Sequence, residues 1–472
     1  MGIGRKYGAI HGNTWSWGSK LGVKQIKVEV NEVTVGMFIS RLDRPWTQTP
    51  FPLQGFYVRD AEEVKQLKSH CKHVYIDVAK GAGPISANLK TISSLGGNAK
   101  AARRMTKQQV FSVPVAPLTI RRNVYNDRRA PLKKEVVKAR QLHQQVFHAV
   151  TEVMESLENN PELSVQGTKR VASEMVDSIL RNPDAFSWLT QVREVDEHTY
   201  SHSVRSAVWA ILFGRHVGLG KQDLNTLAVG VLLKDIGKIN MDSALLLEAK
   251  RTAKQESEYE KFVERGATML RDAGDVGPRV IGVVKAHCER LNGSGFPLHL
   301  KGDKIPFLGK IAGIVTFYDE VTNPRGAAQP VSPSKAVSKL YELRNIEFQE
   351  ELCVEFIRAI GLYPTGTLVE LNTGEVGVVV EQNFERRLKP KVMVVLDACK
   401  HEISRPILVD LAEDDRRKQS MIDKGKKTLE EAEKIEIYQD LEPGSFDVDI
   451  VKIRDDYLFK QMRGGFMNFF KP

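Results

Sequence analysis

The sequence predicts a mainly α-helical protein, in which a helical bundle follows a small α/β domain and precedes a β-hairpin extension. Apolar residues recur at helical spacing through the middle of the 472-residue chain. Near the start of the chain, and again after the helical region, apolar and polar residues alternate as they do in strands. Domains usually contain about 100–200 residues, so this length indicates two to four domains.

Residues 20–88 are predicted to form the α/β domain. The stretch KQIKVEV alternates apolar and polar side chains, as half-buried strands do. The segments GMFISRLDRPW, GFYV and HVYIDVAKG are further strand candidates, and DAEEVKQLKSHC has helical spacing. Strands and a helix within about 70 residues are typical of a small α/β domain.

Residues 89–131 show no sustained periodicity and are predicted to be a basic linker. Within residues 99–140, twelve Lys and Arg face two acidic residues, a balance of +10 that equals the net charge of the whole chain. Such a strip can attract nucleic acid, acidic lipid or an acidic partner. Because three prolines interrupt it and few aromatic residues could stack on bases, we favour a solvated, mobile connector and expect no nucleic-acid partner.

Residues 132–362 are predicted to form the helical domain. The segments SVRSAVWAILFGRHVGL and LNTLAVGVLLKDIG place apolar residues at i, i+3, i+4 and i+7, which is typical of helices packed in a bundle. Further helical segments are PRVIGVVKAH, GKIAGIVTFYDEVT and SPSKAVSKLYELR.

After the helical domain the hydrophobic period changes to two. Residues 363–412 are predicted to form the β extension, with a hairpin turn at Thr373-Gly374. Residues 413–472 are rich in charge and are predicted to be a solvated helix or a mobile tail.

No segment suggests export or membrane insertion. No apolar run approaches the ~20 residues that span a bilayer, and the N-terminal stretch has no apolar core of a secretory signal. The cysteines, Cys71, Cys288, Cys353 and Cys399, are scattered and form no Cys-x-x-Cys pair. This usage is typical of a reducing compartment, so we expect a cytoplasmic protein without a transmembrane segment, a disulfide framework or a zinc finger.

Three clusters could carry chemistry. DEHTYSHSVRS places His198 and His202 four residues apart, on one face of a helix, as two metal ligands require. KDIGK contains Asp235 at the end of an apolar helix. AHCERLNGSGFPLHLKGDKIP joins His287 to a Gly-rich loop whose backbone could approach a phosphate closely. Each cluster alone could serve only the structure, as a turn, a helix cap or a pair of surface histidines. Their joint occurrence in this order is a much more specific sign of a functional site.

With these motifs, residues 190–362 resemble the HD-GYP family, a branch of the HD-domain metal-dependent phosphohydrolases. HCERLNGSGFPLHLKGDKIP is similar to the family's His-His-Glu and Asp-Gly-Ser-Gly-Tyr-Pro run, with Phe296 in place of the name-giving Tyr. Residues 24–80 resemble the N-terminal domain of unknown function found in bacterial members, and LVELNTGEVGVVV resembles their β extension.

The resemblance implies an HD-type helical domain and a role in bacterial cyclic di-GMP signalling. Family members open cyclic di-GMP with a hydroxide that bridges iron or manganese ions held by His and Asp side chains. The ligand positions kept here are His202, Asp235 and His287, and His198 stands at a position that contributes to metal binding in some members. The ligand positions lost are Lys234, Phe262, Cys288 and Thr316, since Asp319 matches a different family Asp.

The lost ligands predict a degenerate metal site. Cys288 could bind metal as a thiolate, but iron and manganese sites prefer imidazole and carboxylate. A buried ammonium at Lys234 would repel a divalent ion, and its pairing with Asp235 or with His287 would replace the metal centre. We therefore expect no cofactor, or iron or manganese if the protein is active.

The positions that bind the nucleotide in the family match better in this sequence than the metal-ligand positions do. The matching residues are Lys238, Gly293, Ser294, Gly295, Lys301 and Arg325. In the family, the residue matched by Arg325 helps to hold the dinucleotide phosphates, and Lys238 would be catalytic only in an active enzyme. Asn292 replaces the Asp of the family's loop.

Three functions remain open, and we rank a non-catalytic HD-GYP domain first. Such a domain would be a receptor for cyclic di-GMP, with weak binding, or an interaction module for signalling proteins such as diguanylate cyclases. The alternative is an active cyclic di-GMP phosphodiesterase with a sparse metal site. The third possibility is that the retained residues, His202, Asp235 and His287, serve only packing and hydrogen bonding.

Overall fold

The computed structural model describes residues 25–44, 49, 51, 55–59, 61–77, 115–116, 118, 120, 124–125, 130–159, 165–189, 198–239, 241–248, 250–325, 329–383, 386, 388–423, 435–442 and 444–460. Two compact units divide the chain, Met1–Met105 and Thr106–Pro472. Most of the predicted basic linker lies outside the described residues. In the described part of the chain, no helix is both long and apolar enough to cross a membrane.

The N-terminal unit contains the predicted α/β domain. Its antiparallel sheet has the order β1-β4-β2-β3, formed by β1 (Gln25–Glu29), β2 (Phe38–Leu42), β3 (Phe56–Tyr57) and β4 (His73–Asp77). Helix α1 (Ala61–His70) buries Leu67 completely, and Ile39 and Ile76 of the sheet are equally buried. The alternation read from the sequence therefore marks the buried face of a real sheet.

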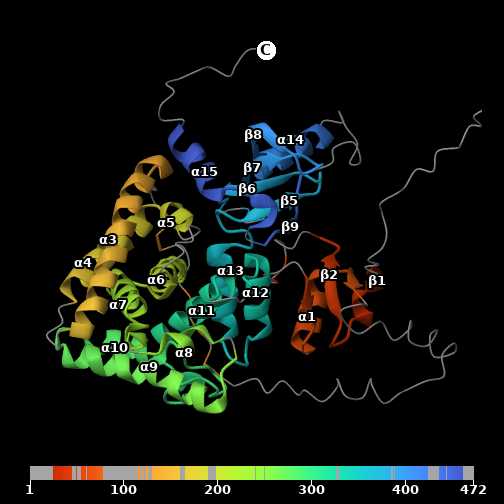
Figure 1. The fold of residues 1–472 in the computed structure, drawn as a ribbon. Helices are drawn as coiled ribbons and strands as arrows, with labels where there is room; N and C mark the ends of the chain where they lie inside the picture. Colours follow the sequence, from red (N-terminus) through yellow and green to blue (C-terminus); the bar gives the residue numbers. More distant parts are fainter. Residues whose placement is uncertain are drawn as a thin grey trace, which may run out of the picture. The chain divides into compact units, whose positions relative to one another are not determined.

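The second unit is mainly helical, as predicted (Figure 1). Its bundle consists of α3 (Leu132–Asn159), α4 (Gln166–Arg181), α5 (Pro183–Leu189), α6 (His198–His216), α7 (Lys221–Leu232), α8 (Ser243–Leu247), α9 (Ala253–Asp272), α10 (Pro278–Ala286), α11 (Phe307–Thr322), α12 (Pro333–Glu342) and α13 (Glu350–Ile360). Helix α3 begins at Leu132, so the last nine residues of the basic strip 99–140 are helical.

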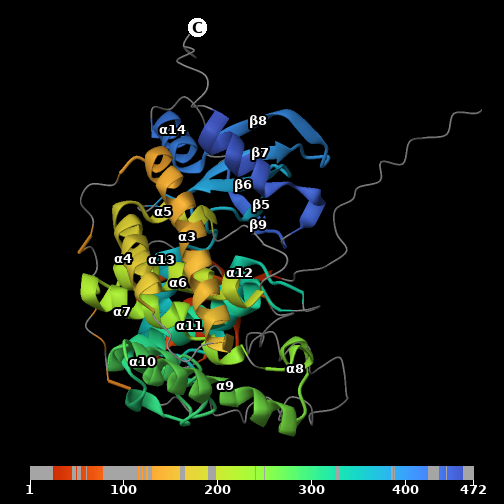
Figure 2. The same cartoon turned by 60° about the vertical axis from the view of Figure 1, so that its left-hand side comes forward.

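Helix α6 lies at the centre of the bundle. It packs against α7, α11, α13 and α3, and Figure 2 shows α3 and α4 side by side next to it. The predicted apolar stripe of α6 is buried, and so are most residues on its other faces. A helix that is buried on nearly all sides lies inside the bundle, and this position brings its polar residues into the protein interior.

The C-terminal part of this unit is a five-stranded antiparallel sheet of order β8-β7-β6-β5-β9. Its strands are β5 (Leu368–Leu371), β6 (Val376–Glu381), β7 (Lys391–Leu396), β8 (Glu402–Asp410) and β9 (Ile437–Asp440). The predicted turn joins β5 to β6, with Gly374 at φ +85°. Trp188 of α5 donates a hydrogen bond of 3.0 Å to the carbonyl of Val380, which ties the sheet to the bundle.

The segment 413–472, predicted to be a solvated helix or a mobile tail, contains helices and also a strand. It carries most of α14 (Leu411–Asp423), strand β9 and helix α15 (Ile450–Asp455). β9 pairs with β5, so the sheet extends beyond the predicted limit at residue 412. Strand β9 was not predicted, because it holds only four residues within a highly charged segment and its sequence, IYQD, barely alternates.

Candidate functional site

The site is built on the tight turn that follows α7. The helix ends at Leu232, and Ile236–Lys238 form a single 3-10 turn. Gly237 is required there, because a Cβ atom at this position would lie 2.0 Å from the backbone oxygen of Phe262 in α9. The close approach of α9 presses the turn into the interior, where Lys234 and Asp235 are 0% and 1% exposed.

Asp235 is the centre of a buried cluster of charges. The ammonium of Lys234 pairs with its Oδ2, and the Nζ of Lys238 lies 2.6 Å from its Oδ1. Ser203 donates a hydrogen bond of 3.3 Å to Oδ2, and the Nε2 of His202 lies 3.8 Å from the same oxygen. Both carboxylate oxygens are therefore engaged by ammonium groups.

These contacts shift the pKa values of all three groups. Burial would raise the pKa of the Asp235 carboxyl, but the Lys234 and Lys238 ammonium groups hold this pKa well below its ordinary value. Burial would lower the pKa of Lys238, but the Asp235 carboxylate raises it above the usual value. Burial lowers the pKa of Lys234, and the Asp235 carboxylate opposes that change. The cluster is an ion triad in which two cations share one anion.

A second carboxylate orients the retained histidine of α6. The Nδ1 of His202 donates to Asp319 Oδ2 at 2.7 Å, and Arg205 reaches both oxygens of Asp319 at 3.0 and 3.1 Å. Burial opposes ionisation of Asp319, but the Arg205 guanidinium lowers its pKa below the ordinary value. Burial lowers the pKa of His202, so its imidazole is neutral and Nδ1 carries the hydrogen.

His287, at the end of α10, lies in the same buried region. Its Nδ1 donates a hydrogen bond of 2.6 Å to the carbonyl of Val284. Burial, followed by repulsion from Lys234, lowers the pKa of His287 to about 3. The Phe262 ring is centred 5.8 Å from the His287 ring, and the Lys238 ammonium lies 4.3 Å from the Phe262 centroid. An aromatic face thus contacts a cation at a position where the family has a ligand.

The other two replaced positions are unsuited to a hard metal ion. Cys288 packs against the apolar cluster of Met241, Phe262 and Val263, and burial raises its pKa to about 12, so it is a thiol. Thr316 on α11 is 3% exposed, and its Oγ1 has no hydrogen-bond partner among the described residues.

The side chains around Asp235 do not fit the iron or manganese centre that the resemblance implies. Such ions take several imidazole and carboxylate ligands. In the described part of this region, no three ligand atoms of His, Cys, Asp or Glu gather within 4.8 Å of one another. The carboxylate at the centre of the cluster, Asp235, is already paired with two ammonium groups.

The Gly-rich loop lies beside this cluster. Gly295 is packed so closely that a Cβ atom would lie 2.3 Å from the carbonyl oxygen of Cys288. The carboxylate of Glu289 accepts hydrogen bonds of 2.8 Å from the backbone of Leu298 and of Leu300, which fixes the loop from inside. The Phe296 ring is centred 6.1 Å from that of Phe262, which links the loop to the Asp235 cluster.

The residues predicted to contact the ligand phosphates are spread over several elements. Ser294 is exposed and its amide donates to Asn292 at 2.9 Å. Lys301 is exposed and its side chain covers Gly293. These residues form one loop surface.

Arg325, beyond the end of α11, reaches the start of α6. Its guanidinium donates to the hydroxyl of Thr199. Burial lowers the pKa of Arg325, whereas the nearby Asp235 carboxylate opposes this change. His198 begins α6, but its side chain lies outside the described residues. The structure therefore brings Arg325 within the electrostatic reach of Asp235 and leaves the role of His198 a prediction.

The sequence reasoning missed Arg205 and Ser203, and it noted Glu289 only as the Glu of the His-His-Glu match. The sequence could have revealed Arg205, because this residue lies three positions after His202 and therefore on the same side of α6. The contact of Ser203 with Asp235 joins residues 32 positions apart and depends on tertiary packing. The contacts of Glu289 lie within its own loop, but the motif match did not predict them.

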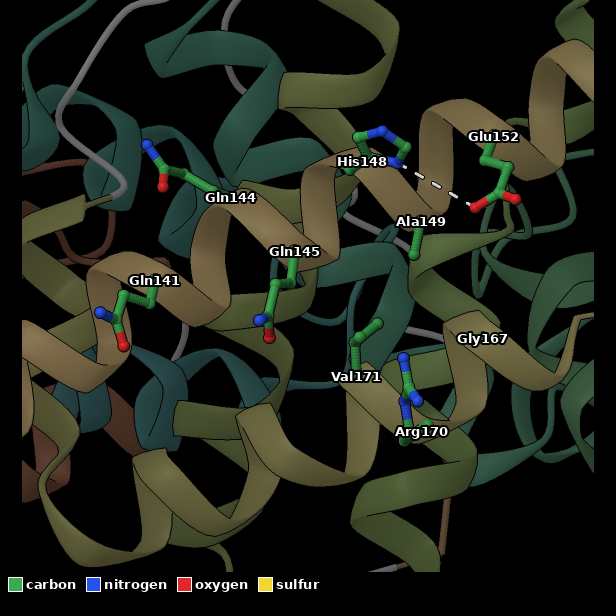
Figure 3. Close-up of a pocket in the computed structure, with 9 residues that line it drawn as sticks. All are labelled: Gln141, Gln144, Gln145, His148, Ala149, Glu152, Gly167, Arg170 and Val171. Atoms are coloured by element: carbon green, nitrogen blue, oxygen red, sulfur yellow. Dashed lines mark ion pairs between the residues drawn. The ribbon is translucent and has the colours of Figure 1, made fainter.

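A separate groove of about 730 Å³ runs along α3 and α4 (Figure 3). Its lining includes Gln141, Gln145 and the ion pair of His148 with Glu152. None of the predicted site residues lines it. The groove is therefore distinct from the Asp235 cluster.

Comparison with protein families gives three matches along the chain. Residues 25–168 match the domain of unknown function DUF3391, residues 190–351 match the HD domain, and residues 368–435 match the KOW domain associated with HD domains. The HD match spans the three clusters singled out in the sequence.

Curated relatives are phosphodiesterases of cyclic dinucleotides. A cyclic di-GMP phosphodiesterase of Pseudomonas aeruginosa is 27% identical over 376 residues, covering 79% of this chain and 85% of the relative. The 3'3'-cGAMP-specific phosphodiesterase 3 of Vibrio cholerae is 26% identical over 171 residues, covering 35% of this chain and 36% of the relative. Among solved structures, an HDG"Y"P protein from Bdellovibrio bacteriovorus aligns with a TM-score of 0.42 at 17% identity, covering 71% of this chain and 98% of that one.

Proposed function

We propose that this chain is a non-catalytic receptor for a cyclic dinucleotide. It is an HD-domain protein, with a DUF3391 domain before the HD domain and an HD-associated KOW domain after it. Its relatives act on cyclic di-GMP or 3'3'-cGAMP, which gives the ligand class. The observation that carries the proposal is the engagement of both Asp235 oxygens by Lys234 and Lys238.

Electrostatics supports the loss of hydrolysis. A divalent ion bound to Asp235 would lie close to the Lys234 ammonium, which is 0% exposed and cannot be screened by water. Two unit charges about 4 Å apart repel by ~4 kcal/mol at an effective dielectric of 20, and a divalent ion doubles this value. Without the metal-bound hydroxide, the phosphodiester lacks its attacking group.

The same charges favour an anion. The cations of this region are Lys234, Lys238, Arg205 and Arg325, and its carboxylates are Asp235, Asp319 and Glu320, the last of which acts on both lysines. Burial lowers the pKa values of His202 and His287, so these two residues add no charge. One positive charge therefore remains in excess. Arg325 lies within the reach of this cluster and is the best-placed group for a ligand phosphate.

One observation favours the alternative, an active phosphodiesterase. Asp319 orients His202 through Nδ1, as outer carboxylates orient metal-ligating histidines, and turns Nε2 toward Asp235. In that case iron or manganese would bind on His202, Asp235 and His287, and Lys238 would take part in catalysis.

Calorimetry with cyclic di-GMP and elemental analysis of the same sample test the proposal. We expect heat of binding, in the weak range, from a protein that contains no stoichiometric iron or manganese. Stoichiometric iron or manganese would favour the active enzyme. The absence of binding would reject the receptor and leave an interaction module for signalling proteins, which pull-down with a diguanylate cyclase would then examine.

A further inference from the structure

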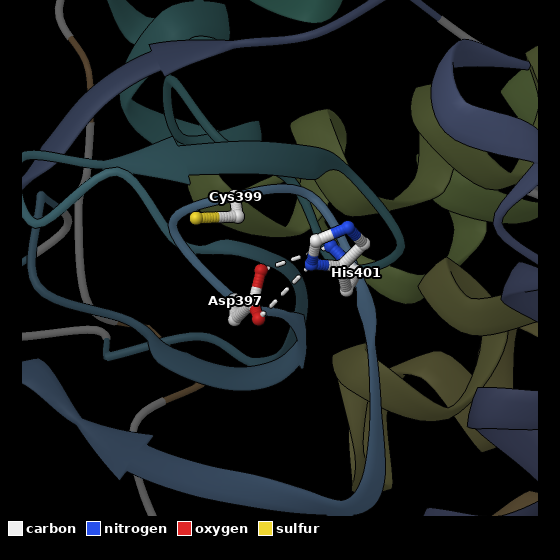
Figure 4. A group of neighbouring side chains, drawn as sticks. All are labelled: Asp397, Cys399 and His401. Atoms are coloured by element: carbon white, nitrogen blue, oxygen red, sulfur yellow. Dashed lines mark hydrogen bonds and ion pairs between the residues drawn. The ribbon is translucent and has the colours of Figure 1, made fainter. Parts of the chain in front are cut away.

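We propose that Asp397, Cys399 and His401 bind one divalent transition-metal ion of the zinc class at the tip of the β7–β8 hairpin (Figure 4). One ligand atom from each side chain lies within 4.8 Å of the other two. The site belongs to the β extension and shares no residue with the Asp235 cluster.

The distances suit a single ion. Zinc binds nitrogen and oxygen at ~2.1 Å, so two such ligands at a tetrahedral angle are ~3.4 Å apart. The Nδ1 of His401 and the Oδ2 of Asp397 are 3.7 Å apart. A small rotation of each side chain would therefore bring both atoms, and the Cys399 sulfur, to one centre.

The turn that carries the three side chains is already ordered by its backbone. The amide of Asp397 donates to the carbonyl of His401 at 2.9 Å, and the amide of Lys400 donates to the carbonyl of Asp397 at 2.9 Å. Asp397 Oδ1 accepts from the amide of His401 at 2.9 Å, which leaves Oδ2 to face the imidazole. Ligands on a fixed turn lose little conformational freedom when they bind an ion.

Lys400, within the same turn, does not repel the ion. Its φ of +69° turns the residue out of the strand direction. Its ammonium pairs with Glu370 of β5 and donates to the carbonyl of Gly374 in the neighbouring turn. The one cation among the five residues is thus committed elsewhere, and it also braces the turn that holds the ligands.

The donor set selects the ion. A thiolate and a carboxylate supply two negative charges, which balance a divalent ion, and thiolate with imidazole prefers zinc and similar ions to magnesium or calcium. Cys399 is exposed, whereas Cys71 and Cys353 are buried and Cys288 is half-buried. Cys399 is the cysteine that can meet a metal from solution, with water completing the tetrahedron.

Cobalt is the probe that tests this site. The full chain, stripped of metal and kept reduced with a non-coordinating phosphine, would be titrated with Co²⁺ and then with Zn²⁺. We expect one equivalent of Co²⁺ to give a thiolate-to-cobalt charge-transfer absorption in the near ultraviolet, which Zn²⁺ abolishes. Zn²⁺ should also slow the reaction of the fastest thiol with Ellman's reagent.

Four variants assign the signal. Cys399→Ser should remove it, and Asp397→Asn, whose amide oxygen can keep the turn hydrogen bond, should weaken Co²⁺ binding about tenfold or more, since even outer-shell changes have such effects. Cys288→Ser and His148→Ala are controls outside the turn and should leave the charge-transfer absorption unchanged.

Two results would overturn the proposal: no charge-transfer band in the unaltered chain, or a band that survives Cys399→Ser. A band that disappears in Cys288→Ser instead would place the metal in the HD domain and would also argue against this site.

Discussion

The ammonium of Lys234 lies against the carboxylate of Asp235 in the interior of the helical domain, and neither side chain is more than 1% exposed. Neighbouring residues in a regular helix point apart. The two meet here because α7 ends at Leu232, and the tight turn after it brings them to the same side. Gly237 permits that turn by letting α9 approach its backbone.

Removing either partner should have unequal effects on stability. Asp235→Ala leaves two buried ammonium groups without their anion and should lower the free energy of unfolding by about 3–5 kcal/mol. Lys234→Met removes one cation, while Asp235 keeps Lys238 at 2.6 Å, so the loss should be smaller. Urea unfolding of the two variants compares the values, and an equal or reversed order would contradict the triad.

The low pKa of His287, about 3, gives a defined pH dependence. Its folded pKa lies below the unfolded value of about 6.5, so the unfolded state binds more protons between these two values. The free energy of unfolding should therefore decrease as the pH falls below about 6.5, by up to ~1.4 kcal/mol per pH unit for this one group. Full stability is present above that pH.

The variant that isolates this effect is His287→Gln, which has no group to titrate. Its stability should fall less steeply than that of the unaltered chain between pH 6.5 and 4. Asp235 and Asp319, whose pKa values are also lowered, lose their contribution below about pH 4 and so affect the curve mainly outside this window. Parallel curves for the two proteins would show that His287 is not buried in the neutral form.

Arg325 should carry much of any cyclic di-GMP affinity. Loss of a charge-assisted phosphate contact in Arg325→Ala should cost about 1.5–3 kcal/mol of binding free energy. Lys335→Ala, an exposed lysine on α12, is the matched control and should bind as the unaltered chain does. Calorimetry measures both, and tight binding that Arg325→Ala leaves intact would show that this residue does not meet the ligand.

Restoring one ligand should not restore the metal centre. Lys234→His removes the repelling ammonium, but Phe262, Cys288 and Thr316 still offer no hard ligand. The combined variant Lys234→His, Phe262→His, Cys288→His and Thr316→Asp should bind iron or manganese, because Asp319 still orients His202. Elemental analysis after dialysis distinguishes the two, and metal retained by the single variant would mean that Lys234 alone had blocked the site.

The sequence predicted more of the helical domain than of the charges inside it. The apolar stripe of α6 indicated a buried helix because its period is local. Lys234 was predicted to pair with Asp235 or with His287, and the choice depended on where α7 ends, which periodicity locates only to within a few residues. Arg205 was missed although it lies three residues after His202, because its partner Asp319 is 114 residues away in the sequence. Strand β9 was missed because four residues carry little pattern.

The most direct test of the account is a turnover assay of the unaltered, full-length chain with cyclic di-GMP in the presence of added Fe²⁺ or Mn²⁺. We expect no hydrolysis above the protein-free control, because the Lys234 and Lys238 ammonium groups lie against both oxygens of the Asp235 carboxylate. Hydrolysis by this chain that is abolished in Asp235→Ala would contradict it and establish an active phosphodiesterase.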